Sequence, residues 1–129
     1  MKYLFDNDIS FRFAAMLRAL GVDAHALRDL YPQNVKDVDF LGDMHQTHGI
    51  ETFVSHNTSQ RTHPVESVLL KGSGVTCLYL SPFWCKLSFW QQAKWLISHW
   101  EKIDGFAKGV VAGTCADIKQ NGRAELYKL

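Results

Sequence analysis

KYLFDNDIS, residues 2–10, places an apolar run directly before a group of acidic residues. The apolar part has the composition of a buried strand, and a helical pattern begins at Ser10. A strand followed by acids and then by a helix is typical of the first unit of a parallel α/β sheet. In open α/β sheets ligands bind outside the carboxyl ends of the strands, so we expect Asp6 and Asp8 to lie at a binding crevice.

Asp6 and Asp8 stand two residues apart, and side chains with this spacing point to the same side of an extended chain. Two carboxylates held close together resist ionising together unless a cation neutralises them. Hard divalent cations prefer oxygen ligands, so the pair indicates a site for Mg²⁺ or Mn²⁺. The alternative is that Asp8 or Ser10 caps the following helix and that Asp6 is solvated.

The composition is typical of one globular domain over residues 1–129. Hydrophobic residues make up 47% of the chain and charged residues 21%, and no apolar stretch approaches the roughly 20 residues of a membrane helix. The sequence shows no signal peptide, and its three cysteines form no CxxC pair, so we expect a cytoplasmic protein with reduced thiols and no contact with membranes. The net charge of +1 indicates no general affinity for nucleic acids, whose binding would need a local basic patch.

Strand-like and helix-like patterns alternate along the chain. Ser88 and Gln91 match the S-x-x-Q capping box of a long helix at about 88–104, and Asn121-Gly122 predicts a hairpin at about 114–127. Alternating strands and helices predict a three-layer α/β/α fold with a mostly parallel sheet of four or five strands, plus the C-terminal β-hairpin. The remaining predicted strands are 22–27, 51–55 and 75–80, and the remaining helices are 10–20, 37–48 and one from about Pro64 to Gly72 or Gly74.

Apolar spacing predicts which helix faces are buried. The expected inward residues are Phe13, Met16, Leu17 and Leu20 in the first helix, Val65, Val68 and Leu69 in the third, and Phe89, Ala93, Leu96, Ile97, Trp100 and Ile103 in the last.

Further polar residues are expected near the same end of the sheet. Asp37 begins the second helix, where it reaches the crevice or serves as a plain N-cap, and a small change of helix phase would bring Asp39 there instead. Asn57 follows the strand 51–55 and offers a neutral oxygen. Arg12 and Arg61 are candidates for binding phosphate groups, although each is also compatible with a solvated surface charge.

Several motifs in order along nearly the whole chain resemble one family. LFDNDIS followed by FRFAAMLRALGVD is similar to the opening of PIN-like nuclease domains. The VapC toxin-like branch is the most similar, on the motifs DVDFL, HPVE, VTCLYLSPFW, LSFWQQAKWLISHW and GTCADIKQNGRAEL.

The resemblance implies a ribonuclease in which clustered acids bind Mg²⁺ or Mn²⁺ and an activated water cleaves RNA. By position it assigns metal binding and catalysis to Asp6, Asp8 and Asp37, with Asp39 as an alternative, and a basic role to Arg61. In the family pattern this strand usually ends with an aspartate, and the matching residue of this chain is Asn57. The family further implies a type II toxin, a cognate antitoxin and a homodimer.

The substitution at Asn57 leaves a second hypothesis open. A catalytically degenerate PIN-like module would bind RNA or protein without cutting it. A receiver-like phosphorelay domain is a third class, but the strand 51–55 is followed by no phosphate-accepting aspartate.

Overall fold

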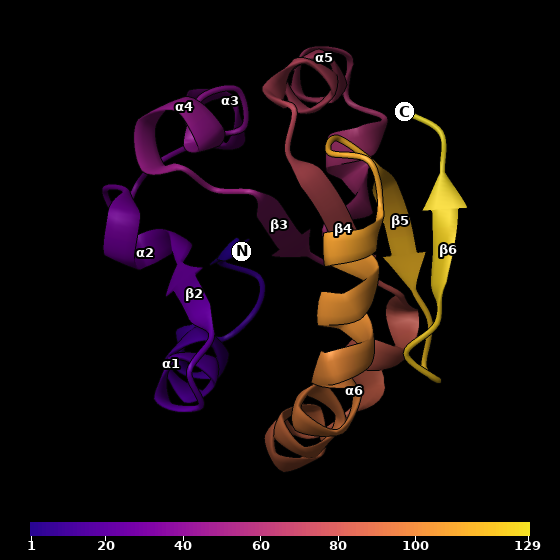
Figure 1. The fold of residues 1–129 in the computed structure, drawn as a ribbon. Helices are drawn as coiled ribbons and strands as arrows, with labels where there is room; N and C mark the ends of the chain where they lie inside the picture. Colours follow the sequence, from indigo (N-terminus) through magenta and orange to yellow (C-terminus); the bar gives the residue numbers. More distant parts are fainter.

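Six strands form one mixed sheet in the order β2-β1-β3-β4-β5-β6 (Figure 1). The computed structural model describes residues 1–129. The first five strands are parallel, and only β6 runs antiparallel, against β5. The strands are β1 (Lys2–Phe5), β2 (Asp23–Ala26), β3 (Thr52–Ser55), β4 (Thr76–Leu80), β5 (Cys115–Ile118) and β6 (Ala124–Tyr127).

This sheet confirms the predicted α/β class and the C-terminal hairpin. The hairpin is also part of the main sheet, because β5 pairs in parallel with β4 while β6 forms the edge. The Asn121-Gly122 turn that joins the two strands has Gly122 at a φ of 80°. A side chain is disfavoured at this dihedral angle, which explains why glycine occupies the turn.

Helices lie on both faces of the sheet (Figure 1). The α-helices are α1 (Phe11–Ala19), α2 (Leu27–Leu30), α3 (Asp37–Phe40), α4 (Met44–His48), α5 (Pro64–Ser73) and α6 (Phe89–Gly109), and two 3₁₀ turns are η1 (Thr58–Arg61) and η2 (Pro82–Lys86). No helix combines the length and the apolar character that a membrane crossing requires.

The alternating residues of β1 divide the core into two layers. Tyr3 and Phe5 pack in one layer with α1 and the long helix α6, whereas Leu4 packs in the other with residues of α2 to α5. The ring of Tyr3 meets the ring of Trp100 at a centroid distance of 4.7 Å. Both layers are apolar, so the central strands β1, β3 and β4 are buried on both faces, whereas β6 at the edge of the sheet has no buried residue.

The prediction of a single helix over 37–48 is wrong. The segment forms α3 and α4, separated by a turn at Gly42. This turn packs so closely on α5 that a Cβ atom at Gly42 would stand 3.0 Å from Cδ2 of Leu69. Asp43 in the same turn accepts a hydrogen bond from the Tyr31 hydroxyl at 2.8 Å, which holds the chain away from a continuous helix.

Several predicted inward faces are also wrong. Val65 and Val68 of α5 are 53% and 69% exposed, and Leu70 is the buried residue of that helix. In α6 Ile97 is exposed while Trp95 is buried, because its indole N–H donates to the carbonyl of Gln120 at 2.7 Å. Leu20 is exposed at the end of α1, whereas Phe13 and Leu17 are buried as predicted.

Candidate active site

Neighbouring parallel strands bring the predicted acids to one edge of the sheet. Phe5 of β1 stands opposite Val54 of β3, and the backbone N–H of Asp6 continues this pairing by donating to the Val54 carbonyl at 2.9 Å. Asp6 therefore follows β1 at the point where Ser55 ends β3. Both side chains lie at the carboxyl end of the sheet, which is where the sequence predicts the crevice.

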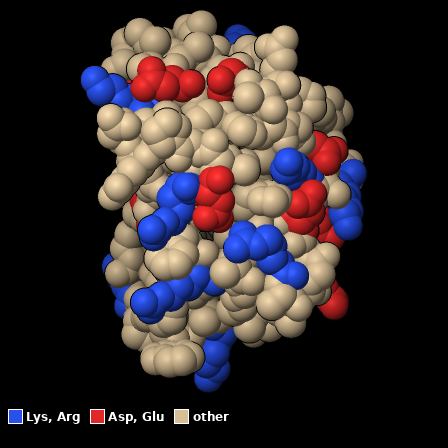
Figure 2. All heavy atoms as spheres, turned by 90° about the vertical axis from the view of Figure 1, so that its left-hand side faces the viewer, with Lys and Arg blue, Asp and Glu red and all other residues tan.

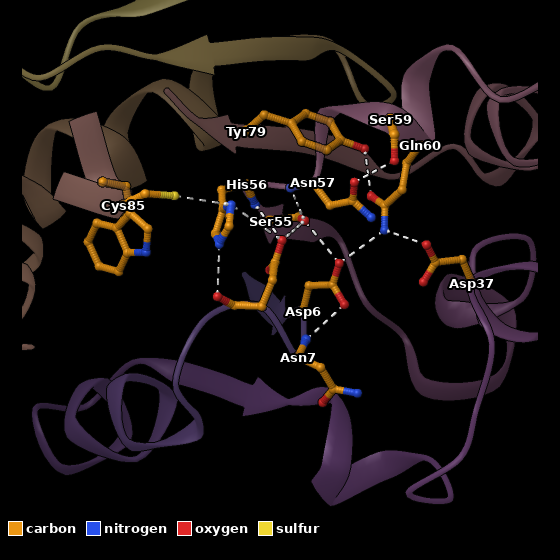
Figure 3. A network of polar contacts seen from close by, with 12 residues as sticks. Asp6, Asn7, Asp37, Ser55, His56, Asn57, Ser59, Gln60, Tyr79 and Cys85 are labelled. Atoms are coloured by element: carbon orange, nitrogen blue, oxygen red, sulfur yellow. Dashed lines mark hydrogen bonds and ion pairs between the residues drawn. The ribbon is translucent and has the colours of Figure 1, made fainter. Parts of the chain in front are cut away.

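The Asp6 carboxylate is almost entirely buried, with 6% of the residue exposed. One oxygen, Oδ2, accepts hydrogen bonds from the Ser55 hydroxyl at 2.9 Å and from the Gln60 amide at 3.0 Å. The other, Oδ1, accepts the backbone N–H of Asn7 at 2.8 Å (Figure 3). Asp6 is thus fixed by three donors and is not the solvated strand end of the alternative interpretation.

Burial, and after it the negative charge of Asp8, raise the pKa of Asp6 from 3.8 to about 6, although the hydrogen bond from Ser55 opposes the shift. A carboxylate stabilised only by neutral donors in a dry environment favours its protonated form. A bound cation would reverse the shift by favouring the ionised form.

Asp8 faces the same hydroxyl as Asp6. Its Oδ2 lies 3.0 Å from Ser55 Oγ and accepts the backbone N–H of His56 at 3.1 Å. Since a serine hydroxyl carries one hydrogen, Ser55 can donate to only one of the two carboxylates at a time. The other oxygen of Asp8, Oδ1, is buried and has no hydrogen-bond partner. One carboxylate oxygen of the pair is therefore left without a donor.

His56 orients the Asp8 segment from the other side. Its Nε2 lies 3.0 Å from the backbone carbonyl of Asp8, which identifies Nε2 as the protonated nitrogen. Nδ1 lies 3.8 Å from the thiol of Cys85 and 3.8 Å from Oδ2 of Asp8 (Figure 3).

Gln60 connects Asp6 to Asp37. Its amide nitrogen donates to Asp6 Oδ2 at 3.0 Å and to Asp37 Oδ2 at 3.1 Å, and its carbonyl accepts the Tyr79 hydroxyl at 3.1 Å. The residue is fully buried, and Figure 3 shows its amide between the two carboxylates. The sequence places Gln60 in a polar loop, so it gives no sign that the η1 turn aims this side chain at the acids.

The structure separates the roles of Asp37 and Asp39. Asp37 points to Gln60 from the first turn of α3, whereas the Asp39 carboxylate accepts the backbone N–H of Lys36 at 3.1 Å and caps that helix. Asp37 therefore joins the network, and Asp39 does not.

Glu66 is an acid of this site that the sequence interpretation missed. Its pKa is raised by burial and by a hydrogen bond with the Asp37 side chain. The HPVE motif places Glu66 in the first turn of α5. An acid at that position is already explained by its favourable interaction with the helix dipole, so the sequence gives no sign of a role in the site.

The other predicted residues lie at the margins of the site. The Asn57 side chain accepts from the Ser59 hydroxyl and contacts none of the three aspartates. Arg61 is 9% exposed and forms an ion pair with Asp117 at 2.9 Å, so its charge is already paired, although its Nε is buried without a hydrogen-bond partner. Arg12 is exposed and forms no ion pair; its guanidinium carbon lies 5.6 Å from the ring centroid of Phe89.

The three aspartates do not converge on one point, because the Gln60 amide stands between Asp6 and Asp37. No group of three His, Cys, Asp or Glu side chains is arranged to hold a metal ion. The Asp6–Asp8 pair by itself fits a hard divalent cation. It offers carboxylate oxygens, one of them without a donor, and Mg²⁺ binds through one or two carboxylates while keeping several waters.

A mostly parallel sheet with buried carboxylates beyond two adjacent strands defines an α/β protein with an acidic site at the strand ends. The family model of the PIN-like domain matches residues 1–82, which is more than half of the chain and contains β1 to β4 together with Asp6, Asp8, Asp37 and Glu66. The chain therefore belongs to the PIN-like domain family and has its nuclease-type fold. Neither a curated protein nor a solved structure matches it significantly.

Proposed function

We propose that this PIN-like protein is a metal-dependent endoribonuclease, with Asp6 and Asp8 as the residues that hold a Mg²⁺ or Mn²⁺ ion. The observation that carries the proposal is the pair itself, a buried Asp6 beside a half-buried Asp8. Two carboxylates share one Ser55 hydroxyl, and Oδ1 of Asp8 has no donor at all. Leaving a buried acceptor unpaired costs stability, so a function for the pair explains why it is present.

The bound ion would supply Lewis acidity, which lowers the pKa of water and neutralises charge on the phosphate oxygens. The chain supplies position. Ser55 and Gln60 fix the rotamer of Asp6, and the Tyr79 hydroxyl fixes Gln60 in turn. Asp37 continues the network at the far side of Gln60, where burial and the neighbouring Asp37 carboxyl raise the pKa of Glu66.

The direct test is Mn²⁺-dependent cleavage of a pool of single-stranded RNAs by the purified chain. Asp6→Asn and Asp8→Asn should each lower the cleavage rate by at least about 100-fold, as removal of a group that stabilises a transition state does. Asp39→Asn is the matched control, because Asp39 is exposed and only caps α3. Undiminished cleavage by Asp6→Asn would refute the metal mechanism.

We further propose that the protein is the toxin of a type II toxin–antitoxin pair. Its motifs from DVDFL to GTCADIKQNGRAEL support this, because they resemble the VapC toxin-like branch. Expression of the chain should then arrest growth of the host cell, Asp6→Asn should relieve the arrest, and co-expression of a small protein encoded beside it should do the same. Growth at the normal rate would reject the toxin role while leaving the nuclease proposal to the cleavage assay.

Homodimerisation and antitoxin binding are part of the same proposal. Exposed apolar side chains support such contacts: Val68 of α5 is 69% exposed and Trp90 of α6 is 76% exposed. A monomeric mass in solution at micromolar concentration would reject the homodimer.

A degenerate binding module is the second candidate, and two observations favour it. Asn57 replaces an acid, and the neutral Gln60 amide fills the space between Asp6 and Asp37. This candidate predicts RNA or protein binding without cleavage at any concentration of Mn²⁺. It also predicts that Asn57→Asp does not alter the chemistry.

A further inference from the structure

A cavity of about 530 Å³ opens beside Asp6, between the start of α1 and the α2 region. Its wall joins the Asp6 carboxylate to the amides of Asn7 and Gln33, the ring of Phe11 and the guanidinium group of Arg28. This volume lies in the range of small-molecule sites, which run from about 300 to 1,000 Å³. The cavity therefore extends from the acidic site to a surface that carries amides, an aromatic ring and an arginine.

Phe11 offers an accessible aromatic face in this cavity. It is 43% exposed, whereas Phe13 two residues later is buried against Trp84 and Phe89. The guanidinium carbon of Arg28 lies 4.2 Å from the centroid of the Phe11 ring. A flat, delocalised group thus already rests on the ring, and a nucleobase has the same planar shape.

Two arginines without acidic partners flank this ring. Among the arginines of α1 and α2 only Arg18 forms an ion pair, with Asp29 at 3.6 Å. The Arg28 side chain forms no ion pair or hydrogen bond and lies over the Phe11 ring, and the guanidinium carbon of Arg12 lies 5.9 Å from the same centroid. Figure 2, which faces this side of the molecule, shows Lys and Arg side chains gathered on the lower half of the face. Unpaired guanidinium groups on an exposed face are suited to phosphate.

The two amide side chains of the cavity are also unengaged. Neither the Asn7 nor the Gln33 side chain forms a hydrogen bond within the chain, although both border the space beside Phe11. An amide presents a donor and an acceptor side by side, which is the pattern on the edge of a nucleobase. Single-stranded RNA is recognised by this combination of stacking and edge contacts.

We propose that the cavity binds one nucleotide of single-stranded RNA next to the bond that is cut. The base stacks on Phe11 in place of the Arg28 guanidinium, which turns to a phosphate, and Asn7 and Gln33 contact the edge of the base. This inference rests on the proposed ribonuclease function, because it names how the same site holds its substrate.

The test measures RNA binding without cleavage. Fluorescence anisotropy with short labelled single-stranded RNAs in EDTA gives the Kd of the full chain, and a matched strand without bases measures the phosphate contribution alone. Phe11→Ala and Phe11→Leu should each weaken binding of the strand with bases about tenfold, and Phe11→Trp should preserve it. Binding of the strand without bases should be the same in the wild type and all three variants.

Arg28→Ala should weaken binding of both strands and reduce the dependence of Kd on salt, while Arg123→Ala in the hairpin should change neither. Thermal unfolding of each variant checks that the fold is intact, and Phe11→Leu retains an apolar side chain at the position.

The outcomes separate this inference from the function on which it rests. Equal Kd values for Phe11→Ala and the wild type, or no binding of RNA by the wild type, would overturn the nucleotide cavity even if the chain cleaves RNA. Binding that depends on Phe11 in a chain that never cleaves RNA with Mn²⁺ would support the cavity and overturn the ribonuclease.

Discussion

Gln60 and Arg61 are neighbours in the η1 turn, yet they belong to two buried polar networks with opposite charge balance. Gln60 reaches the carboxylates of Asp6 and Asp37, neither of which forms an ion pair with a lysine or an arginine. Arg61 points the other way, to Asp117 of β5 at 2.9 Å, with its guanidinium carbon 3.8 Å from the ring centroid of Tyr127.

The difference shows how to tell a structural network from a functional one. A buried charge that has its counter-ion, as Arg61 has, can hold elements together, here η1 and the C-terminal hairpin. Buried carboxylates without a counter-ion destabilise the fold unless something else neutralises them. We therefore infer that the hairpin side acts as structure, and we propose the acidic side as the place where a ligand binds. Tyr79 joins the two, since its hydroxyl donates to Gln60 while its ring lies under Arg61.

The largest expected effect comes from breaking the balanced network. Arg61→Ala leaves Asp117 without its counter-ion and should lower the free energy of unfolding by about 3–5 kcal/mol in urea titrations. Arg123→Ala, an exposed residue of the same hairpin, should change it by less than about 0.5 kcal/mol. Similar values for the two variants would show that the Arg61 network does not stabilise the protein.

The acidic network should instead make stability fall as pH rises. The pKa of Asp6 is about 6 in the folded chain and 3.8 without the protein environment, so the folded state binds this proton more tightly. The resulting stability is fully present below about pH 4 and is lost as the pH rises through about 6, by up to about 3 kcal/mol.

Urea titrations over this pH range check the sign of the effect. Asp6→Asn should remove the decline, because an amide does not titrate, and Asp39→Asn should retain it. An unchanged decline in Asp6→Asn would assign the effect to another group.

The smallest expected effect tests the connection between the networks. Tyr79→Phe removes the donor to Gln60 but keeps the ring under Arg61, and should cost about 1 kcal/mol of unfolding free energy. Tyr127→Phe makes the same chemical change at a hydroxyl without a hydrogen-bond partner. Chemical denaturation should show little change for Tyr127→Phe, and equal losses would contradict the role of the Tyr79 hydroxyl.

The sequence predicted best those elements that are determined by residues adjacent to one another in the chain. KYLFDNDIS predicts β1 and the following helix because an apolar run, two acids and a cap stand next to one another, and Ser88 does cap α6 through the Gln91 N–H. The hairpin follows from Asn121-Gly122 in the same way.

Tertiary contacts explain what the sequence could not provide. The break between α3 and α4 depends on the close approach of Gly42 to Leu69, and the buried face of α5 depends on its packing against the sheet through Leu70. Within the site, the positions of Asp6 and Asp8 could be predicted because both follow strand β1. Gln60 lies in η1 and Glu66 in the first turn of α5, and the orientation of these two elements is set by the rest of the fold. The resemblance assigned Arg61 a basic role at the site, but its ion pair depends on β5, far along the chain.

Calorimetric titration of the purified chain with Mn²⁺ tests most directly whether the buried acids form a cation site. We predict binding of one ion, with release of protons near pH 6 as Asp6 ionises, and loss of binding in Asp6→Asn but not in Asp39→Asn. Absence of binding at millimolar Mn²⁺, or equal binding by Asp6→Asn, would contradict the proposed site and favour the binding module.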